Sequence, residues 1–267
     1  MIALLAAAFA SSRNPLIAIA LATFREAVRN KVLYSILFFA VALIVLALAL
    51  GSASLNQDAL VIKSIGLFAI HFFSDMIALF IGVTMVYQEL ERKTIYNVLS
   101  KPIARPAYFL GKYAGMAFTL LVQLTLMGAV LSVVLATRGE ALTTTLYAAL
   151  LLAWVESLVV LGFALFFASF STPYVSGFLA LGMWAVSNLT QNLALYLPAI
   201  EDAGARAVAE LVVKVLPDFS LLSLTTQLRY GIPLVDGYVL HAATYGLSIA
   251  AFFVVAGASI FSRRDFI

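Results

Sequence analysis

Residues 32–51 read "VLYSILFFAVALIVLALALG". This stretch lies within a run of 26 residues, between Lys31 and Asp58, that contains no charged side chain. A transmembrane α-helix needs about 20 consecutive apolar residues, because the hydrocarbon core of a bilayer is about 30 Å thick. The stretch therefore predicts a helix that crosses a membrane.

The rest of the chain has the same character. Of its 267 residues, 64% are hydrophobic and 11% are charged, and the mean hydropathy is +1.06. An ordinary soluble domain has about 25% charged residues. The absence of cysteine excludes disulfides, thiolate metal sites and a cysteine nucleophile. The formal net charge of +3 is too small to indicate a nucleic-acid partner. The composition predicts an all-α integral membrane protein embedded in a lipid bilayer.

Charged residues mark the ends of the spans, because an ionised side chain at the bilayer centre costs at least about 2.5 kcal/mol. Runs of 25 or 26 residues that are uncharged or nearly so follow Lys63, Lys112 and Asp236. The 44 uncharged residues after Glu156 are too many for one crossing, and Pro173 interrupts them, so they predict two helices. We expect six spans, at about 33–52, 64–87, 112–136, 146–170, 175–197 and 237–260.

An even number of spans places both termini on one side of the membrane. That side carries eleven of the lysines and arginines, against five on the other. The positive-inside rule therefore predicts cytoplasmic termini. Residues 1–13 are interpreted as an N-terminal extension and residues 14–267 as a single transmembrane domain.

Two segments are expected at the inner membrane surface. The helix that begins at Pro15 has one apolar face and one charged face, which is typical of a helix lying along the inner leaflet, although a cytoplasmic extension of the first span is an alternative. Tyr108, Phe109 and Lys112 are expected to anchor the start of the third span among the lipid headgroups.

Residues 88–113, "QELERKTIYNVLSKPIARPAYFLGKY", form a polar cytoplasmic loop between the second and third spans. Within it, Ile95, Val98 and Leu99 are spaced to share one face of a short helix. An apolar face flanked by charges can dock into a groove on a partner protein. The alternative is a solvated loop whose apolar residues fold back onto the ends of the spans.

A second polar region is expected on the outer side, between the fifth and sixth spans. Arg206, Glu210 and Lys214 follow one another at intervals of four, which predicts an amphipathic helix lying on the outer surface. It could cover the transport pathway, bind an extracytoplasmic partner, or be a packed surface helix with neither role.

Four ionisable side chains lie inside or near the ends of the spans: His71, Asp75, Glu156 and His241. Such residues are candidates for function by default. His71 and Asp75 are one helical turn apart and could pair with each other. Structural hydrogen bonding, lining of a substrate pathway, and a metal or proton relay remain open as roles, although this pair supplies too few ligands for a metal site.

The loop at 88–113 resembles the signature loop of ABC-2 type transporter permeases. In that superfamily, a glutamate at the end of the second span precedes a threonine, a Leu-Leu-Ser-x-Pro-x-x-Arg turn and a Gly-Lys pair. Lys93 replaces the usual glycine before the threonine. This departure, together with "FREAVRNKVLYSILFF", "ASFSTPYVSGF" and "IFSRRDF", is similar to the permeases grouped with multicopper-enzyme maturation, including the nitrous-oxide reductase maturation permease.

The resemblance implies a permease subunit of an exporter in the cytoplasmic membrane of a prokaryote. It further implies a second permease copy and a pair of separate ABC ATPase subunits that carry the ATP and magnesium, since this chain contains no Walker motif. The loop would contain a coupling helix that docks on the ATPase. The residues that match the motif are Glu89, Thr94, Leu99, Ser100, Pro102 and Arg105, and Ile95 and Val98 fall on the docking face.

Two other classes of function are less well supported by the sequence. An intramembrane hydrolase would need a nucleophile with a base or a metal triad, and neither histidine lies near an HExxH or GxSxG motif. A self-contained secondary transporter would be expected to contain internal repeats, and none is apparent. A neighbouring gene for an ABC ATPase would favour the permease over either alternative.

Overall fold

The computed structural model describes residues 15–52, 58–91, 104–200 and 202–263, with only the backbone described at 85–91 and 191–192. In this part of the chain there are nine α-helices, two short 3-10 helices and no β-strand. The elements are α2 (Pro15–Val28), α3 (Lys31–Ser52), α4 (Asp58–Glu91), α6 (Arg105–Thr137), α7 (Thr144–Ala168), α8 (Pro173–Tyr196), η1 (Leu197–Ala199), α9 (Ala203–Val215), η2 (Phe219–Leu222), α10 (Thr225–Tyr230) and α11 (Tyr238–Arg263). The all-α prediction is confirmed.

Five helices are long and apolar enough to cross a bilayer: α3, residues Asp58–Thr84 of α4, α6, α7 and α11. Each overlaps one of the predicted spans. The remaining predicted span, at 175–197, corresponds to α8, which is not among the five. Its second half carries polar residues, including Ser187, Asn188 and Thr190, which lower its apolar content.

Polar contacts between helices establish which helix ends lie together. The Lys63 ammonium lies 2.7 Å from Glu140 Oε2, and Arg138 Nη1 lies 3.2 Å from Asp58 Oδ2, so the start of α4 meets the end of α6. At the opposite end of the bundle, Arg105 Nη1 donates to the carbonyl oxygen of Ser262 at 3.2 Å, which joins the start of α6 to the end of α11.

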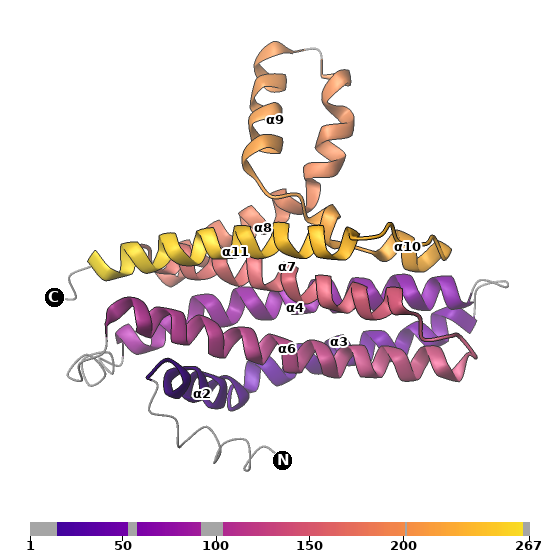
Figure 1. Cartoon of the computed structure of the whole chain (residues 1–267), viewed down its shortest axis with the longest axis horizontal. Coiled ribbons are helices and arrows are strands. Elements are labelled where there is room, and N and C mark those ends of the chain that lie inside the picture. Colours follow the sequence, from indigo (N-terminus) through magenta and orange to yellow (C-terminus); the bar gives the residue numbers. More distant parts are fainter. Residues whose placement is uncertain (1–14, 53–57, 92–103, 201, 264–267) are drawn as a thin grey trace.

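The chain between α7 and α11 therefore has to return across the bundle. A turn of a few residues connects α6 to α7, so α7 ends where α6 begins, and α11 ends there too. Residues 169–237 bring the chain back to the other end through α8, α9, η2 and α10 (Figure 1). The start of α3 and the end of α11 therefore lie at the same end of the bundle.

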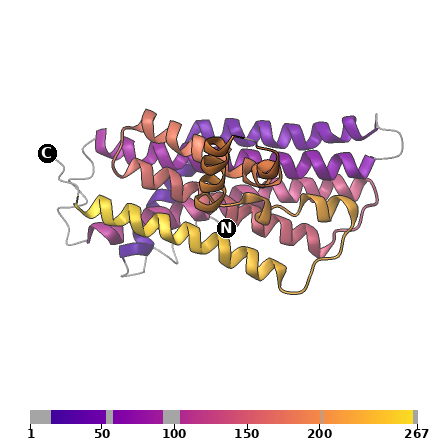
Figure 2. The ribbon, with the colours of Figure 1, turned by 90° about the horizontal axis from the view of Figure 1, so that it is seen from above.

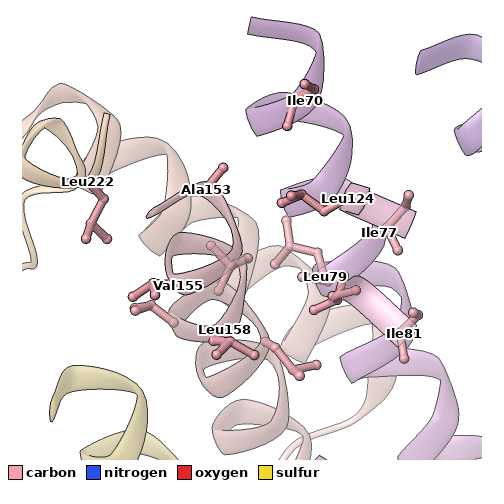
Figure 3. Packing of buried hydrophobic residues seen from close by; sticks show 14 of the residues in the cluster. Ile70, Ile77, Leu79, Ile81, Leu124, Ala153, Val155, Leu158 and Leu222 are labelled. Carbon is pink, nitrogen blue, oxygen red and sulfur yellow. The ribbon is translucent and has the colours of Figure 1, made fainter. Parts of the chain in front are cut away.

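The core is centred on α7, which packs against both α4 and α11. Figure 3 shows buried side chains of α4, including Ile77 and Leu79, and of α7, including Val155 and Leu158, which belong to the same hydrophobic cluster. A Cβ built on Gly82 of α4 would lie 2.5 Å from Ala164 Cβ of α7. Because glycine has no side chain, the two backbones can approach each other closely, as is common between membrane helices.

The N-terminal helix α2 packs along the first part of α6. A Cβ on Gly115 would lie 2.4 Å from the carbonyl oxygen of Ala20, and Phe24 contacts Phe118 edge-on at 4.9 Å between ring centroids. A helix is present at the predicted position, beginning at Pro15. Its most buried residues are Thr23 and Ala27, on the face that meets α6.

The predicted headgroup anchors at the start of α6 are buried instead. Tyr108, Phe109 and Lys112 are each at most 5% exposed. Phe261 of α11 lies 5.6 Å from the Phe109 ring and stacks on Tyr108 at 6.3 Å. The prediction was wrong for these side chains, because the end of α11 covers Tyr108 and Phe109, and Lys112 lies over the buried Tyr108 ring.

The amphipathic helix predicted around Arg206 is confirmed as α9. It does not lie flat against the bundle. Figure 1 shows α9 and the adjacent part of α8 standing away from the bundle, roughly perpendicular to the long helices, and Figure 2 shows them end-on near mid-length.

Candidate functional site

A cluster of polar side chains is buried between α4, α7 and α8. His71 and Asp75 lie on the same face of α4, one turn apart, but the expected pairing between them is not found. His71 Nδ1 lies 2.5 Å from Glu156 Oε2 of α7, and Trp184 Nε1 of α8 donates to Asp75 Oδ2 at 2.7 Å. At this depth α7 carries the carboxyl group of Glu156 and α8 carries the indole of Trp184. His71 therefore bonds to α7, and Asp75 bonds to α8.

The carboxyl groups of the cluster are almost completely shielded from solvent. Asp75 is 2% exposed and Glu156 is 3% exposed, and the two side chains interact electrostatically. His71 can contribute at most one positive charge to balance two carboxyl groups. Since an uncompensated charge is costly inside a membrane, the cluster is suited to holding a proton or to binding a polar or cationic group.

Several polar atoms of the cluster have no hydrogen-bond partner among the residues described. These atoms include His71 Nε2 and the neighbouring Ser74 Oγ, and both are buried. Asp75 Oδ1 also has no donor, but the Asp75 carboxyl group lies against that of Glu156. A buried polar atom without a partner costs free energy, so such atoms are able to bind a further group. No set of three or more histidine, aspartate or glutamate side chains could hold a metal ion within the described ranges.

His241 does not belong to this cluster. It lies in the first turn of α11, where its Nδ1 is 2.8 Å from the carbonyl oxygen of Gly237, and its side chain is exposed. Gly237 has a φ of 80°, a backbone conformation that favours glycine. His241 therefore lies at the start of α11, apart from the buried cluster.

Only the edges of the predicted coupling segment are described. Glu89 lies in the last turns of α4, and Arg105 begins α6. The Arg105 guanidinium lies over the C-terminal end of α11, where a cation is favoured by the helix dipole. The other predicted docking residues lie outside the described residues: Thr94, Ile95, Val98, Leu99, Ser100 and Pro102.

Sequence reasoning missed Trp184 as a member of the cluster. A lone tryptophan near the middle of a predicted span needs a partner for its N–H group, and this signal could have indicated a buried acceptor nearby. Trp184 also contacts Phe72 edge-on, with 6.0 Å between ring centroids. The second tryptophan, Trp154, behaves similarly and donates to the carbonyl oxygen of Ala117 at 3.2 Å.

The apolar helices, their packing and the buried polar cluster define a multi-pass membrane protein. A family model described as ABC-2 family transporter protein matches residues 17–266. The chain therefore belongs to the ABC-2 family of transporter proteins. A search of the curated proteins finds no match.

Proposed function

We propose that this chain is the transmembrane permease subunit of an ABC exporter, which couples ATP hydrolysis by a separate subunit to movement of a substrate across the membrane. The observation that carries the proposal is the family match over residues 17–266, on a chain with five helices able to span a bilayer. The chain has no Walker motif, so the ATP and magnesium would be bound by the partner ATPase.

The geometry of the bundle supports a docking role for the cytoplasmic loop. The end of α4 and the start of α6 flank the loop, and Arg105 joins the start of α6 to the end of α11. Movement imposed on the loop by an ATPase would therefore reach three helices. Ile95, Val98 and Leu99 would provide the apolar contact, flanked by Glu89, Thr94, Ser100 and Pro102.

The polar cluster has a structural role in this proposal. It joins α4 to α7 through His71 and Glu156, and α4 to α8 through Asp75 and Trp184. A second candidate function is a self-contained secondary transporter, which the buried Asp75 and Glu156 favour, because such carboxyl groups can carry coupled protons.

The cargo and cellular setting follow from the resemblance alone. We place the permease in the cytoplasmic membrane of a prokaryote, with both termini inside, working as a homodimer with two ATPase subunits. Its similarity to permeases grouped with multicopper-enzyme maturation suggests a cargo required for metalloenzyme assembly, and an extracytoplasmic partner could receive it.

Purification of the tagged chain from its native membrane tests the proposed function. We expect a subunit with Walker motifs to co-purify, and the complex to hydrolyse MgATP. A chain that transports its cargo in proteoliposomes driven by an ion gradient, with no ATPase bound, would support the secondary transporter instead.

A further inference from the structure

A chain of polar contacts runs across three helices at the buried cluster. Trp184 Nε1 of α8 donates to Asp75 Oδ2 of α4 at 2.7 Å, and His71 Nδ1 of α4 lies 2.5 Å from Glu156 Oε2 of α7. Between these two contacts, the Asp75 carboxyl group lies against that of Glu156. The two carboxyl groups therefore form the centre of the chain, with the indole at one end and the imidazole at the other.

The contact between the two carboxyl groups lacks a donor. Asp75 Oδ1 is buried and has no hydrogen-bond donor among the residues that the structure describes. An ionised carboxyl group only accepts hydrogen bonds, so two ionised groups placed together repel each other. Both side chains are at most 3% exposed, so bulk water does not screen the repulsion. A single proton between the two groups supplies the missing donor and removes one of the two negative charges.

The charges of the cluster indicate which carboxyl group holds the proton. His71 lies beside Glu156, so a positive charge on the imidazole can be balanced by a negative charge on Glu156. Asp75 instead contacts the indole of Trp184, which offers an N–H group and no charge. The cluster carries no net charge when His71 is positive, Glu156 is negative and Asp75 is protonated and donates to Glu156. This state avoids the cost of an unbalanced charge inside the membrane.

The other helices packed against α4 and α7 direct their described titratable groups elsewhere. On α3 and α8 such groups occur only in the end turns, at Lys31, Tyr34, Tyr174 and Tyr196. On α6 they lie near the start of the helix, where Tyr113 donates to the carbonyl oxygen of Leu158. Arg229 of α10 lies over the Tyr230 ring, and Tyr245 of α11 accepts a backbone N–H group. The titratable group that acts on both α4 side chains of the cluster is therefore Glu156.

We propose that Asp75 and Glu156 bind one exchangeable proton between them, and that this proton allows α4 and α7 to close against each other. Release of the proton leaves two negative charges facing each other in a site shielded from water, where repulsion is strong. The repulsion drives the Asp75 carboxyl group away from Glu156 and disturbs its contact with Trp184. The cluster is thus a proton-binding site as well as a set of contacts between helices. The inference goes beyond the proposed function and depends on neither the ATPase nor the cargo.

The fluorescence of Trp184 provides the first test. The chain has two tryptophans, so Trp154→Phe leaves Trp184 as the single indole, and its contact with Asp75 makes its emission sensitive to the charge of that carboxyl group. With the detergent-solubilised chain alone, we expect the emission to change in one step as the pH is raised. Adding Asp75→Asn should abolish the step, because an amide copies the neutral carboxyl group, with one acceptor oxygen and a donor. The matched control is Asp58→Asn, at a partly exposed ion pair, which should keep the step.

The melting temperature provides a second test. A proton that is held in the folded bundle and released on unfolding makes stability fall as the pH rises. The melting temperature of Asp75→Asn, relative to that of the unaltered chain, should therefore rise steadily with pH. A relative melting temperature that stays constant over the pH range in which both proteins are folded would contradict the proposal.

Infrared spectroscopy detects the proton itself. The spectrum of the unaltered chain minus that of Asp75→Asn, at neutral pH, should contain the carbonyl band of one protonated carboxyl group. Absence of this band would overturn the proposal, and a band without a fluorescence step would show that the proton is not exchangeable. If Asp75→Asn does not fold, Glu156→Gln replaces it: the fluorescence step should then move to lower pH, because Asp75 no longer faces a negative charge. An unmoved step would contradict the shared site. All measurements omit the ATPase, so failure of the proposed function would leave them unchanged.

Discussion

His71 on α4 and Glu156 on α7 are 85 residues apart in the chain, and their side chains lie 2.5 Å apart. The contact joins two of the most extensively packed helices of the bundle, α4 and α7. A charge-assisted hydrogen bond in a shielded site is among the stronger polar contacts a protein makes. The stability of the bundle should therefore depend on it.

Replacing Glu156 with glutamine keeps the shape of the side chain but removes the charge that faces His71. We expect a loss of about 1–3 kcal/mol in the free energy of unfolding, because His71 loses its charged partner. Unfolding of the detergent-solubilised protein measures the change. Glu140→Gln is the control, since Glu140 pairs with Lys63 at a partly exposed site and should lose less than about 1 kcal/mol. Equal losses at the two sites would contradict a special contribution from the buried pair.

Trp184→Phe removes the N–H group that bonds to Asp75 and retains an aromatic ring. We expect a loss of about 1–3 kcal/mol, because a buried carboxyl oxygen is left without its donor. Trp154→Phe is the matched control, since it loses a bond to a neutral carbonyl oxygen and should lose less. Full stability together with lost transport for Trp184→Phe would instead place Asp75 in the transport pathway.

Gly246 of α11 lies where a side chain would collide with α7. A Cβ built there would lie 2.5 Å from Val155 Cγ1, so Gly246→Ala should force the helices apart and lower the melting temperature. Gly182 in α8 has no atom within 4 Å of a built Cβ, and Gly182→Ala should be neutral or stabilising by about 0.5–1 kcal/mol. A stabilised Gly246→Ala protein would show that α7 and α11 are packed less closely than described.

The orientation in the membrane can be tested with single cysteines at opposite ends of the bundle. A cysteine at Ser262 should resist an impermeant thiol reagent in intact cells, because the termini are predicted to be cytoplasmic. A cysteine at Leu142, in the turn between α6 and α7, should react. The reverse pattern of labelling would place the termini outside and remove the basis for a cytoplasmic coupling loop.

The positions of the spans could be predicted from the sequence because a charged residue is costly to bury in the membrane whichever helices surround it. The uncharged run after Lys31 forms α3, whose bounds of Lys31–Ser52 agree closely with the predicted span at 33–52. The partner of His71 could not be predicted, since it depends on which helices are neighbours and at what depth they cross. The same holds for Phe109, whose burial depends on where α11 ends.

The docking of the cytoplasmic loop on an ATPase is tested most directly by Ile95→Asp together with Leu99→Asp. If these side chains fill a groove on the ATPase, the new charges should abolish the contact, while insertion and melting temperature stay near those of the unaltered chain. The matched control is Leu142→Asp, a charge added at the opposite end of the bundle. The decisive measurement is the amount of ATPase that co-purifies with the double variant: we predict almost none for the loop variant and a normal amount for the control. Normal ATPase co-purification with the loop variant would contradict the coupling role of the loop.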